Sequence, residues 1–314
     1  ALCVGRVLQK REQMHQATYL GRGKTGELKD LIWETQADGI ICDDELSPAQ
    51  IGNLKDELGV KIMDRTLLIL DIFAARASTS EGKIQVELAQ LKYRQSRLTG
   101  LGTSLSRLGG GIGTRGPGEK KLEMDRRLIK GRISQLTREL KEVKRHRQLT
   151  RESRAKSRIP VIAIVGYTNA GKSTLLNALT GAGILAEDKL FATLDPTTRN
   201  LKLPGGQEVL LTDTVGFIRK LPHHLVEAFK ATLEELSFAD LLLHVIDASN
   251  EEWREQAAVV DELIHELGAD QTPRIEVFNK CDRWTGDIRP HGENIVSISA
   301  KTGEGLPELL AAID

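Results

Sequence analysis

The stretch Val161-Ile-Ala-Ile-Val-Gly-Tyr-Thr-Asn-Ala-Gly-Lys-Ser173 determines which fold this chain adopts. Its apolar first half predicts a buried strand, and residues 172–179 predict a helix. The connection fits the pattern G-x-x-x-x-G-K-S, in which glycines let backbone amides wrap around phosphate groups at the positive end of a helix. The stretch therefore predicts a phosphate-binding loop in an α/β domain.

Two further segments supply groups that a bound nucleoside triphosphate needs. Lys172 is expected to reach the β- and γ-phosphates, and the Ser173 hydroxyl is expected to bind Mg²⁺. The apolar strand 210–212 ends in Asp213, which can hold Mg²⁺ through water. The amide of Gly216 can bond the γ-phosphate and so sense its loss.

The pattern Asn279-Lys-Cys-Asp282 predicts that the base is guanine. A buried carboxylate at Asp282 would accept hydrogen bonds from guanine N1 and N2. Adenine has an acceptor at N1 and would leave the carboxylate unpaired, at a cost of roughly 1–3 kcal/mol. Ser299-Ala-Lys301, after the last expected strand, can add a backbone amide to guanine O6. Together these motifs predict a GTPase.

The segment 191–199 must supply a threonine for Mg²⁺ and the γ-phosphate, and its position alone leaves three candidates open: Thr193, Thr197 and Thr198. Phe217 follows Gly216, where many GTPases have a glutamine that orients the attacking water. Because phenylalanine cannot hydrogen-bond a water, we expect hydrolysis to be slow until a partner rearranges the site.

Three domains are expected along the 314 residues. Residues 159–314 alternate strands and helices with a hairpin around 204–206, which predicts a GTPase domain with a mostly parallel sheet and one antiparallel edge strand. Residues 1–66 predict a small α/β domain with parallel pairing. Its expected elements are helices at 26–37 and 48–58 and strands at 38–43 and 60–63.

Residues 67–158 are different in kind. Apolar residues recur at 4-3 spacing over 84–98 and over 129–143, which predicts an antiparallel helical hairpin (a coiled coil) with a glycine-rich loop at 100–118. Residues 81–158 hold 21 Lys and Arg against 8 Asp and Glu, a net charge of +13 in a chain of zero formal charge. This favours a polyanion partner over a merely solvated coiled coil, with Arg107 and Arg115 as phosphate contacts.

The composition limits the class of protein. Apolar residues make up 40% and charged residues 28%, as in globular proteins, and the 4% of aromatic residues argues against stacking platforms for single-stranded nucleic acid. Three scattered cysteines, Cys3, Cys42 and Cys281, are expected to be reduced thiols of a cytoplasmic protein. We expect no transmembrane helix and no signal peptide, and both ends are expected to be cut from a longer protein.

Residues 108–127, LGGGIGTRGPGEKKLEMDRR, resemble the signature of HflX-type GTPases of the Obg-HflX group, and FATLDPTTR at 191–199 resembles their switch I. The resemblance covers essentially the whole chain. It implies GTP and GDP binding, association with the 50S ribosomal subunit, and splitting of stalled or idle 70S ribosomes. It also implies that the hairpin tip reaches 23S rRNA near the peptidyl-transferase centre, and that the protein is a monomer off the ribosome.

The resemblance implies Thr193 as the switch threonine, which makes Lys172, Thr193 and Gly216 the expected catalytic groups. It also fits a hydrophobic residue at position 217. The full nucleotide-binding prediction comprises Gly166, Tyr167, Thr168, Asn169, Ala170, Gly171, Lys172, Ser173, Thr174, Phe191, Ala192, Thr193, Leu194, Asp195, Asp213, Thr214, Val215, Gly216, Asn279, Lys280, Cys281, Asp282, Ser299, Ala300 and Lys301. The predicted Mg²⁺ ligands are Ser173, Thr193 and, through water, Asp213, and the predicted rRNA contacts are Arg107, Gly110, Gly111 and Arg115.

Some alternatives stay open at this point. Asn169 either holds K⁺ against the phosphates, as in related GTPases, or stabilises the loop. The chain either splits ribosomes or is a GTP-gated rRNA-binding assembly factor or chaperone of the large subunit. A second nucleotide site in the first domain is disfavoured, because the glycine-rich stretch 21–26 does not match G-x-x-x-x-G-K-[ST].

Overall fold

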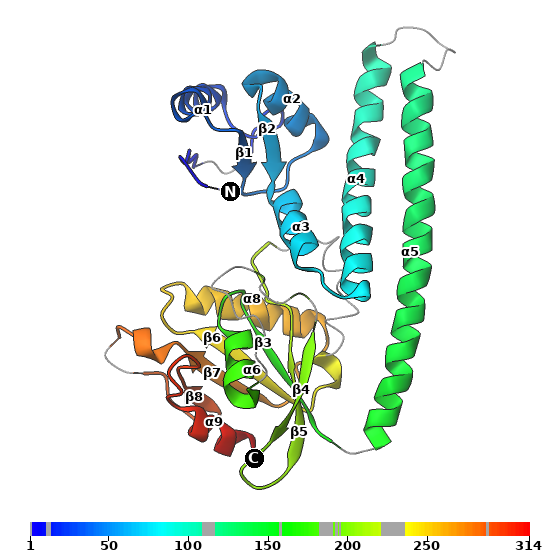
Figure 1. Ribbon diagram of the computed structural model, residues 1–314. Coiled ribbons are helices and arrows are strands. Elements are labelled where there is room, and N and C mark those ends of the chain that lie inside the picture. The colour runs from blue at the N-terminus through cyan, green and yellow to red at the C-terminus, as the bar shows by residue number, and fades with distance from the viewer. Residues whose placement is uncertain are drawn as a thin grey trace. The chain divides into compact units, whose positions relative to one another are not determined.

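A computed structural model describes residues 2–10, 14–108, 117–156, 159–181, 191, 194, 196–220, 236–286 and 289–314. The chain forms two compact units, one made of residues 1–72 and 87–138 and the other of 73–86 and 139–314 (Figure 1). The division into three domains at 66 and 158 remains a prediction. In the described part of the chain, no helix combines the length and the apolar character that crossing a membrane requires.

The first unit starts with a small α/β fold: α1 (Arg22–Thr35), β1 (Gly39–Cys42), α2 (Pro48–Leu58) and β2 (Lys61–Asp64). The two strands pair in parallel, as predicted. Helix α2 begins where predicted because Ser47 and Gln50 form a capping box, and it ends at Gly59, whose φ is +70°. Leu54, which is fully buried, belongs to the apolar core of this fold.

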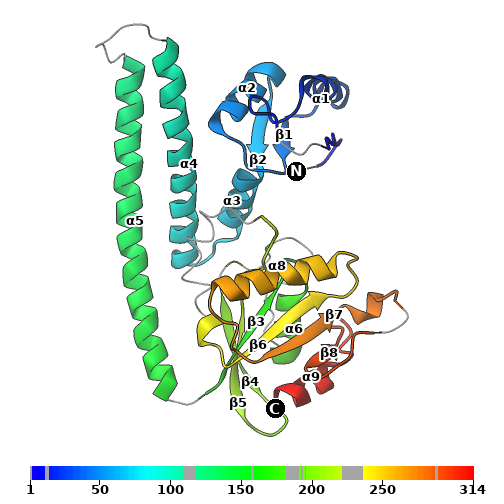
Figure 2. The same ribbon diagram turned by 180° about the vertical axis from the view of Figure 1, so that it is seen from behind.

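The predicted helical hairpin is present as α4 (Ser80–Leu108) and α5 (Pro117–Lys156), which run side by side in Figures 1 and 2. The guanidinium of Arg132 on α5 holds the carboxylate of Glu87 on α4 through two bonds of 2.7 and 3.0 Å. The predicted loop at 100–118 is too long, because α4 continues to Leu108. The apolar spacing of Leu101, Leu105 and Leu108 extends the helical pattern past Gly100.

Helix α3 (Arg65–Arg76) was not predicted as a separate element. It starts directly after β2, so the sequence carries no turn signal between strand and helix. The carboxylate of Asp64 marks the start of the helix instead, because it accepts a hydrogen bond of 2.9 Å from the backbone N–H of Leu67.

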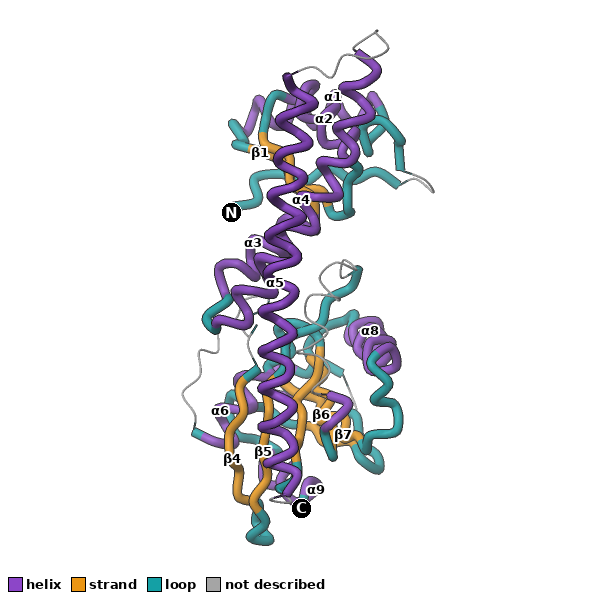
Figure 3. The backbone as a smooth tube through the Cα atoms, turned by 90° about the vertical axis from the view of Figure 1, so that its right-hand side faces the viewer, coloured by secondary structure: helices purple, strands orange, loops and turns teal. Residues whose placement is uncertain are grey.

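The second unit contains a six-stranded sheet in the order β4-β5-β3-β6-β7-β8. Its strands are β3 (Val161–Gly166), β4 (Thr197–Lys202), β5 (Glu208–Asp213), β6 (Leu241–Asp247), β7 (Arg274–Asn279) and β8 (Ile295–Ser297). Only the β4–β5 pair is antiparallel, and β4 is the edge strand, as predicted. The hairpin at Pro204–Gly206 joins these two strands (Figure 3).

Helices cover both faces of this sheet. Helix α6 (Lys172–Thr180) and helix α8 (Trp253–Glu266) lie on opposite sides of it in Figure 3, and α9 (Leu306–Ile313) follows β8. Short 3-10 turns occupy Leu236–Phe238 and Cys281–Arg283. The core between α6, α9 and the sheet is apolar and includes Ile164, Leu175, Leu211, Val277 and Leu309. Because the central strands are parallel, their carboxyl ends meet along one edge of the sheet.

Asp64, at the end of β2, is the centre of a buried polar cluster. Its carboxylate accepts hydrogen bonds from the Tyr93 hydroxyl at 3.0 Å and the Arg97 guanidinium at 2.7 Å, both on α4, and from the backbone N–H of Leu46 at 3.2 Å. The side chain of Asp64 is fully buried. The cluster therefore joins the α/β fold to the hairpin within the first unit.

We predict that Asp64→Ala lowers the free energy of unfolding of the first unit by about 3 kcal/mol, because it removes the buried carboxylate that bonds Tyr93, Leu46 and the half-buried guanidinium of Arg97. The matched control is Asp43→Ala, which removes the salt bridge of Arg65 to a carboxylate that is 86% exposed. The control should cost about 0–1 kcal/mol. Urea unfolding followed by circular dichroism measures both, and equal losses would contradict the predicted role of the cluster.

Candidate functional site

The predicted phosphate-binding loop connects β3 to α6. Gly171, just before α6, has a φ of +97°, and a Cβ on it would lie 2.2 Å from the Asn279 side chain. A Cβ on Gly166 would lie 2.3 Å from the backbone oxygen of Val245 on the neighbouring strand. Both glycines of the motif are thus required by close approach of other groups, as well as by backbone conformation.

Lys172, the first residue of α6, is folded back over the loop. Its ammonium donates hydrogen bonds to the backbone oxygens of Gly166 at 3.2 Å and Tyr167 at 3.0 Å. Burial lowers the pKa of Lys172 to about 8, and the nearby carboxylate of Asp213 acts in the opposite direction. The ammonium is therefore held inside the loop, where an anionic ligand would stabilise its charge.

Ser173 and Asp213 are brought together from α6 and β5. The Ser173 hydroxyl donates a hydrogen bond of 2.7 Å to the Asp213 carboxylate, and both residues are buried. Hard oxygen donors of this kind fit Mg²⁺, which is held by one or two protein oxygens together with phosphate and water. In the described part of the chain, no group of three or more His, Cys, Asp or Glu residues is arranged as a metal site. The pair therefore fits a cation that a nucleotide helps to bind.

The segment after β5 lies against the phosphate-binding loop. The Thr214 hydroxyl donates to the backbone oxygen of Ile164 at 2.7 Å. A Cβ on Gly216 would lie 2.8 Å from the Cα of Thr168 and 3.0 Å from the Lys172 ammonium, so only glycine fits there. Two backbone hydrogen bonds then join Phe217 to the loop, and its side chain is 2% exposed. This buried ring has no group that could orient a water.

Asn279 at the end of β7 ties the predicted base-binding segments to the phosphate-binding loop. Its amide nitrogen donates to the backbone oxygen of Ala170 at 2.8 Å, and its amide oxygen accepts from the backbone N–H of Ala300 at 3.0 Å. Lys280 has a φ of +62° and donates to the backbone oxygen of Asn169 at 2.9 Å. These three bonds bring segments from three strands into one site.

Two features of this region differ from the sequence prediction. Asp282 is exposed, so the expectation of a buried carboxylate is wrong for the protein alone. Asp247 was not predicted, yet its carboxylate accepts a bond of 2.7 Å from the Lys280 ammonium and so fixes the direction of that side chain. Its position as the last residue of a buried strand was the available signal, because the carboxyl ends of parallel strands converge.

The remaining predicted residues differ in where the structure places them. Tyr167, Thr174 and Val215 lie in the site segments already described, Cys281 and Ser299 are buried beside Asn279, and Lys301 is exposed. Phe191 and Leu194 are both buried. Ala192, Thr193, Asp195, Gly110, Gly111 and Arg115 lie outside the described residues, and Arg107 is described only as part of helix α4. Asn169 has a φ of +64°, a conformation that asparagine tolerates, which supports its loop-stabilising interpretation.

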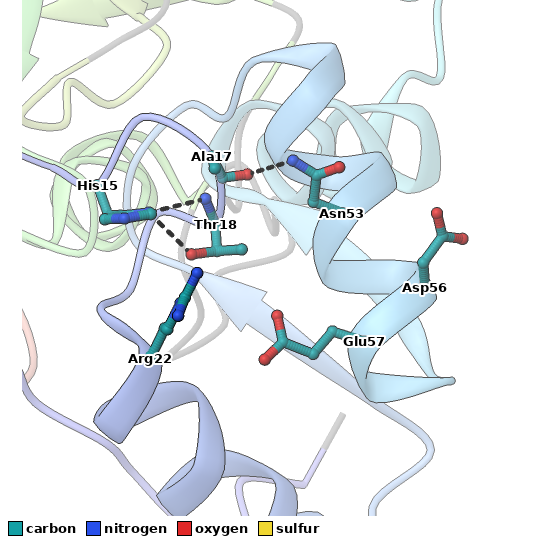
Figure 4. A pocket seen from close by; sticks show the side chains of 7 residues that line it. All are labelled: His15, Ala17, Thr18, Arg22, Asn53, Asp56 and Glu57. Carbon is teal, nitrogen blue, oxygen red and sulfur yellow. Dashed lines mark hydrogen bonds between the residues drawn. The ribbon is translucent and has the colours of Figure 1, made fainter. Parts of the chain in front are cut away.

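A separate pocket of about 610 Å³ lies in the first unit between the segment before α1 and helix α2 (Figure 4). The polar groups of its upper part bond one another: Asn53 donates to the backbone oxygen of Ala17 at 2.8 Å, and the ring of His15 contacts Thr18 at 3.0 Å. Asp56 and Glu57 line its other side. The lining has two carboxylates against one guanidinium, that of Arg22, and this net negative charge disfavours a polyphosphate ligand, in agreement with the missing loop motif.

Comparisons with known proteins agree with this geometry. Three family models match: a GTP-binding GTPase N-terminal region over residues 1–74, a GTP-binding GTPase middle region over 76–154, and a 50S ribosome-binding GTPase over 161–280. The GTPase HflX of Lacrimispora saccharolytica is 64% identical over 100% of this chain and 75% of its own length. The GTPase HflX of Escherichia coli is 47% identical over 96% of this chain and 72% of its own length.

Among solved structures, a GTP-binding protein of the archaeon Sulfolobus solfataricus in complex with GDP has a TM-score of 0.52 at 28% identity, covering 96% of this chain and 87% of that one. The fold and these matches define a P-loop GTPase, an enzyme that hydrolyses GTP. Within that class, the chain belongs to the HflX family of GTPases.

We predict that nucleotide affinity falls as pH rises above about 8, because the ammonium of Lys172 loses its proton in the free protein at that pH. Bound phosphates should raise this pKa again, so the complex takes up a proton. Stability has the opposite trend: the pKa of Lys172 in the folded protein lies below the ordinary lysine value of 10.5, so its contribution to folding becomes more favourable as the pH rises from about 8 to 10.5.

Isothermal titration calorimetry with GDP, at pH values on both sides of 8, measures the affinity. Repeating it in buffers of different ionisation enthalpy gives the number of protons taken up on binding. The same titration at pH 7 is the control, since Lys172 is charged there in both states. A flat affinity without proton uptake would contradict the prediction.

Proposed function

We propose that this protein is a GTP-driven factor that binds the large (50S) ribosomal subunit and dissociates stalled or idle 70S ribosomes in the cytoplasm. One observation carries the proposal: the nucleotide site and a long antiparallel hairpin belong to one chain, and residues 81–158, which hold the hairpin, have a net charge of +13. Ribosomal RNA is the polyanion that such a surface fits. The match to a family model described as a 50S ribosome-binding GTPase supports the same partner.

In this proposal the nucleotide site is formed by the groups that surround the phosphate-binding loop. Lys172 contacts the β- and γ-phosphates, the Gly216 amide bonds the γ-phosphate, and Asp282 binds guanine once the base is present. Ser173, Thr193 and, through water, Asp213 hold Mg²⁺, which neutralises charge on the phosphates. A K⁺ ion beside Asn169 is a further proposal, and equal activity in K⁺ and Na⁺ would argue against it.

The buried ring of Phe217 sets the kinetic expectation. Because this side chain is packed into the protein and cannot bond a water, hydrolysis by the protein alone should be slow. A ribosome that positions the attacking water would accelerate it. GTP would then favour the ribosome-bound form, and hydrolysis would release the factor.

The second candidate is an assembly factor or chaperone of the large subunit that binds rRNA without splitting ribosomes. The same basic hairpin favours it, since phosphate contacts alone do not separate subunits. Whether 70S ribosomes disappear when the protein binds distinguishes the two functions.

We predict that the protein with a non-hydrolysable GTP analogue converts 70S ribosomes into free 30S and protein-bearing 50S subunits in a sucrose gradient, and that GDP does not. The double variant Arg127→Glu/Lys130→Glu reverses two exposed charges on α5 and should weaken 50S binding. It should also make binding less sensitive to salt: the slope of log K against log salt concentration should become shallower by about 0.7–0.9 for each lost phosphate contact.

The matched control is Lys29→Glu/Lys55→Glu, which reverses two exposed charges on α1 and α2. It should leave the gradient unchanged. Binding to 50S without loss of 70S would replace splitting with the assembly function. If the protein sediments with neither subunit, both ribosomal functions are contradicted and only the GTPase activity remains supported.

A further inference from the structure

Arg219 lies three residues after Gly216 and bonds two other elements of the second unit. Its backbone N–H donates a hydrogen bond of 3.1 Å to the hydroxyl of Tyr167 in the phosphate-binding loop. Its guanidinium donates to two carboxylates at the start of α8, that of Glu255 at 2.8 Å and that of Glu252 at 3.4 Å. Arg219 therefore joins the segment after β5 both to the phosphate-binding loop and to α8.

The bond to Tyr167 extends the pairing between this segment and the loop. Phe217 is already joined to the loop by backbone hydrogen bonds of 2.7 and 3.1 Å, and the bond of Arg219 is the next one along the same two segments. Lys220 then follows with a φ of +53°, a costly conformation for a lysine. Because Arg219 directly precedes this strained position, its contacts help to hold the backbone there.

Gly216 is thereby held from both sides. On its N-terminal side, the Thr214 hydroxyl bonds the backbone oxygen of Ile164 at 2.7 Å. On its C-terminal side are the bonds of Phe217 and Arg219. A group that is fixed between two anchors loses less conformational entropy when it binds a ligand. The backbone amide of Gly216, the proposed γ-phosphate donor, is fixed in this way.

We propose that Arg219 is a positioning residue for the γ-phosphate of GTP: its contacts with Tyr167 and α8 fix the segment that carries the Gly216 amide. The proposal rests on the proposed role of that amide in binding the γ-phosphate. GDP lacks this phosphate, so GDP binding does not use the Gly216 amide. Arg219 therefore raises the affinity for GTP and leaves the affinity for GDP unchanged.

The carboxylates on α8 allow a sharp test, because they lie outside the nucleotide motifs. Glu252→Gln/Glu255→Gln removes both partners of the Arg219 guanidinium. It should weaken the binding of a non-hydrolysable GTP analogue about threefold, as expected for exposed ion pairs, and leave GDP affinity unchanged. Arg219→Ala should have the same selective effect. Arg219→Lys, which keeps the charge, should recover part of the loss.

The matched control is Asp261→Asn/Glu262→Gln, which also removes two carboxylates from α8, together with the salt bridge of Asp261 to Arg274. This variant should leave the ratio of the analogue affinity to the GDP affinity unchanged. An unchanged ratio in Arg219→Ala, or an equal loss for both nucleotides, would overturn the proposal.

Salt provides a second readout that a purely structural role of Arg219 would not affect. The side chain of Arg219 is 49% exposed, so its ion pairs are open to screening by salt. Between about 0.1 M and about 1 M salt, the screening length falls from about 10 Å to about 3 Å. The difference in affinity ratio between the wild type and Arg219→Ala should therefore shrink, and a constant difference would contradict the role of the ion pairs.

Tyr167→Phe tests the other anchor, because it removes only the hydroxyl that accepts from the N–H of Arg219. It should lower the same affinity ratio and speed amide hydrogen exchange at Arg219. Unchanged exchange and an unchanged ratio would overturn the part of the proposal that concerns Tyr167.

Gly216→Ala separates this proposal from the function on which it rests, because the added Cβ would displace the Gly216 amide. Retained GDP binding shows that each variant is folded. If Gly216→Ala lowers the affinity ratio and the Arg219 and α8 variants do not, the role of Gly216 stands and the proposal for Arg219 is overturned. If the ratio is unchanged in Gly216→Ala as well, both roles are contradicted.

Discussion

The two hydrogen bonds of the Asn279 side chain are the constraint on which the proposed nucleotide site depends. One reaches Ala170 in the phosphate-binding loop and the other comes from Ala300 after β8. The amide is buried, so leaving either partner unsatisfied would cost about 1–3 kcal/mol. A carboxamide suits this place because it has both a donor and an acceptor, and it can satisfy one backbone group on each side. The side chain of Asn279 therefore holds together two segments, at Ala170 and Ala300, that are 130 residues apart in the sequence.

The parallel sheet brings the partners of Asn279 close enough for these two hydrogen bonds to form. Loops after β3, β5, β6, β7 and β8 all leave the sheet at the same edge. Close packing then limits the side chains that fit in each loop. A Cβ on Gly171 would clash with Asn279, and a Cβ on Gly216 would clash with Thr168 and Lys172. The charged groups are balanced locally, with Lys280 held by Asp247 at 2.7 Å. The described groups of the site are therefore already fixed to one another by packing and hydrogen bonds before a nucleotide binds.

Much of this arrangement was predictable from sequence because its signals are local. The strand before the loop, the caps of α2 at Ser47 and Gly59, and the antiparallel edge strand follow from apolar patterning, capping residues and turn residues. The end of α4 was missed because glycines at 100 and 102 interrupt a helix that apolar spacing continues. Tertiary contacts have no such local signal in the sequence. Neither the ion pair between Asp247 and Lys280 nor the edge-to-face contact between the rings of Phe73 and Phe191 could be predicted from the spacing of residues.

The most direct test of this account is the affinity of Asn279→Ala for GDP and for a GTP analogue, measured beside the melting temperature. The account predicts that both affinities fall together by about tenfold or more, since the variant removes two hydrogen bonds that hold loops common to both nucleotides. Circular dichroism should still show the folded sheet. Unchanged affinities in a folded variant would contradict the claim that the Asn279 side chain holds the segments after β3, β7 and β8 together as one site.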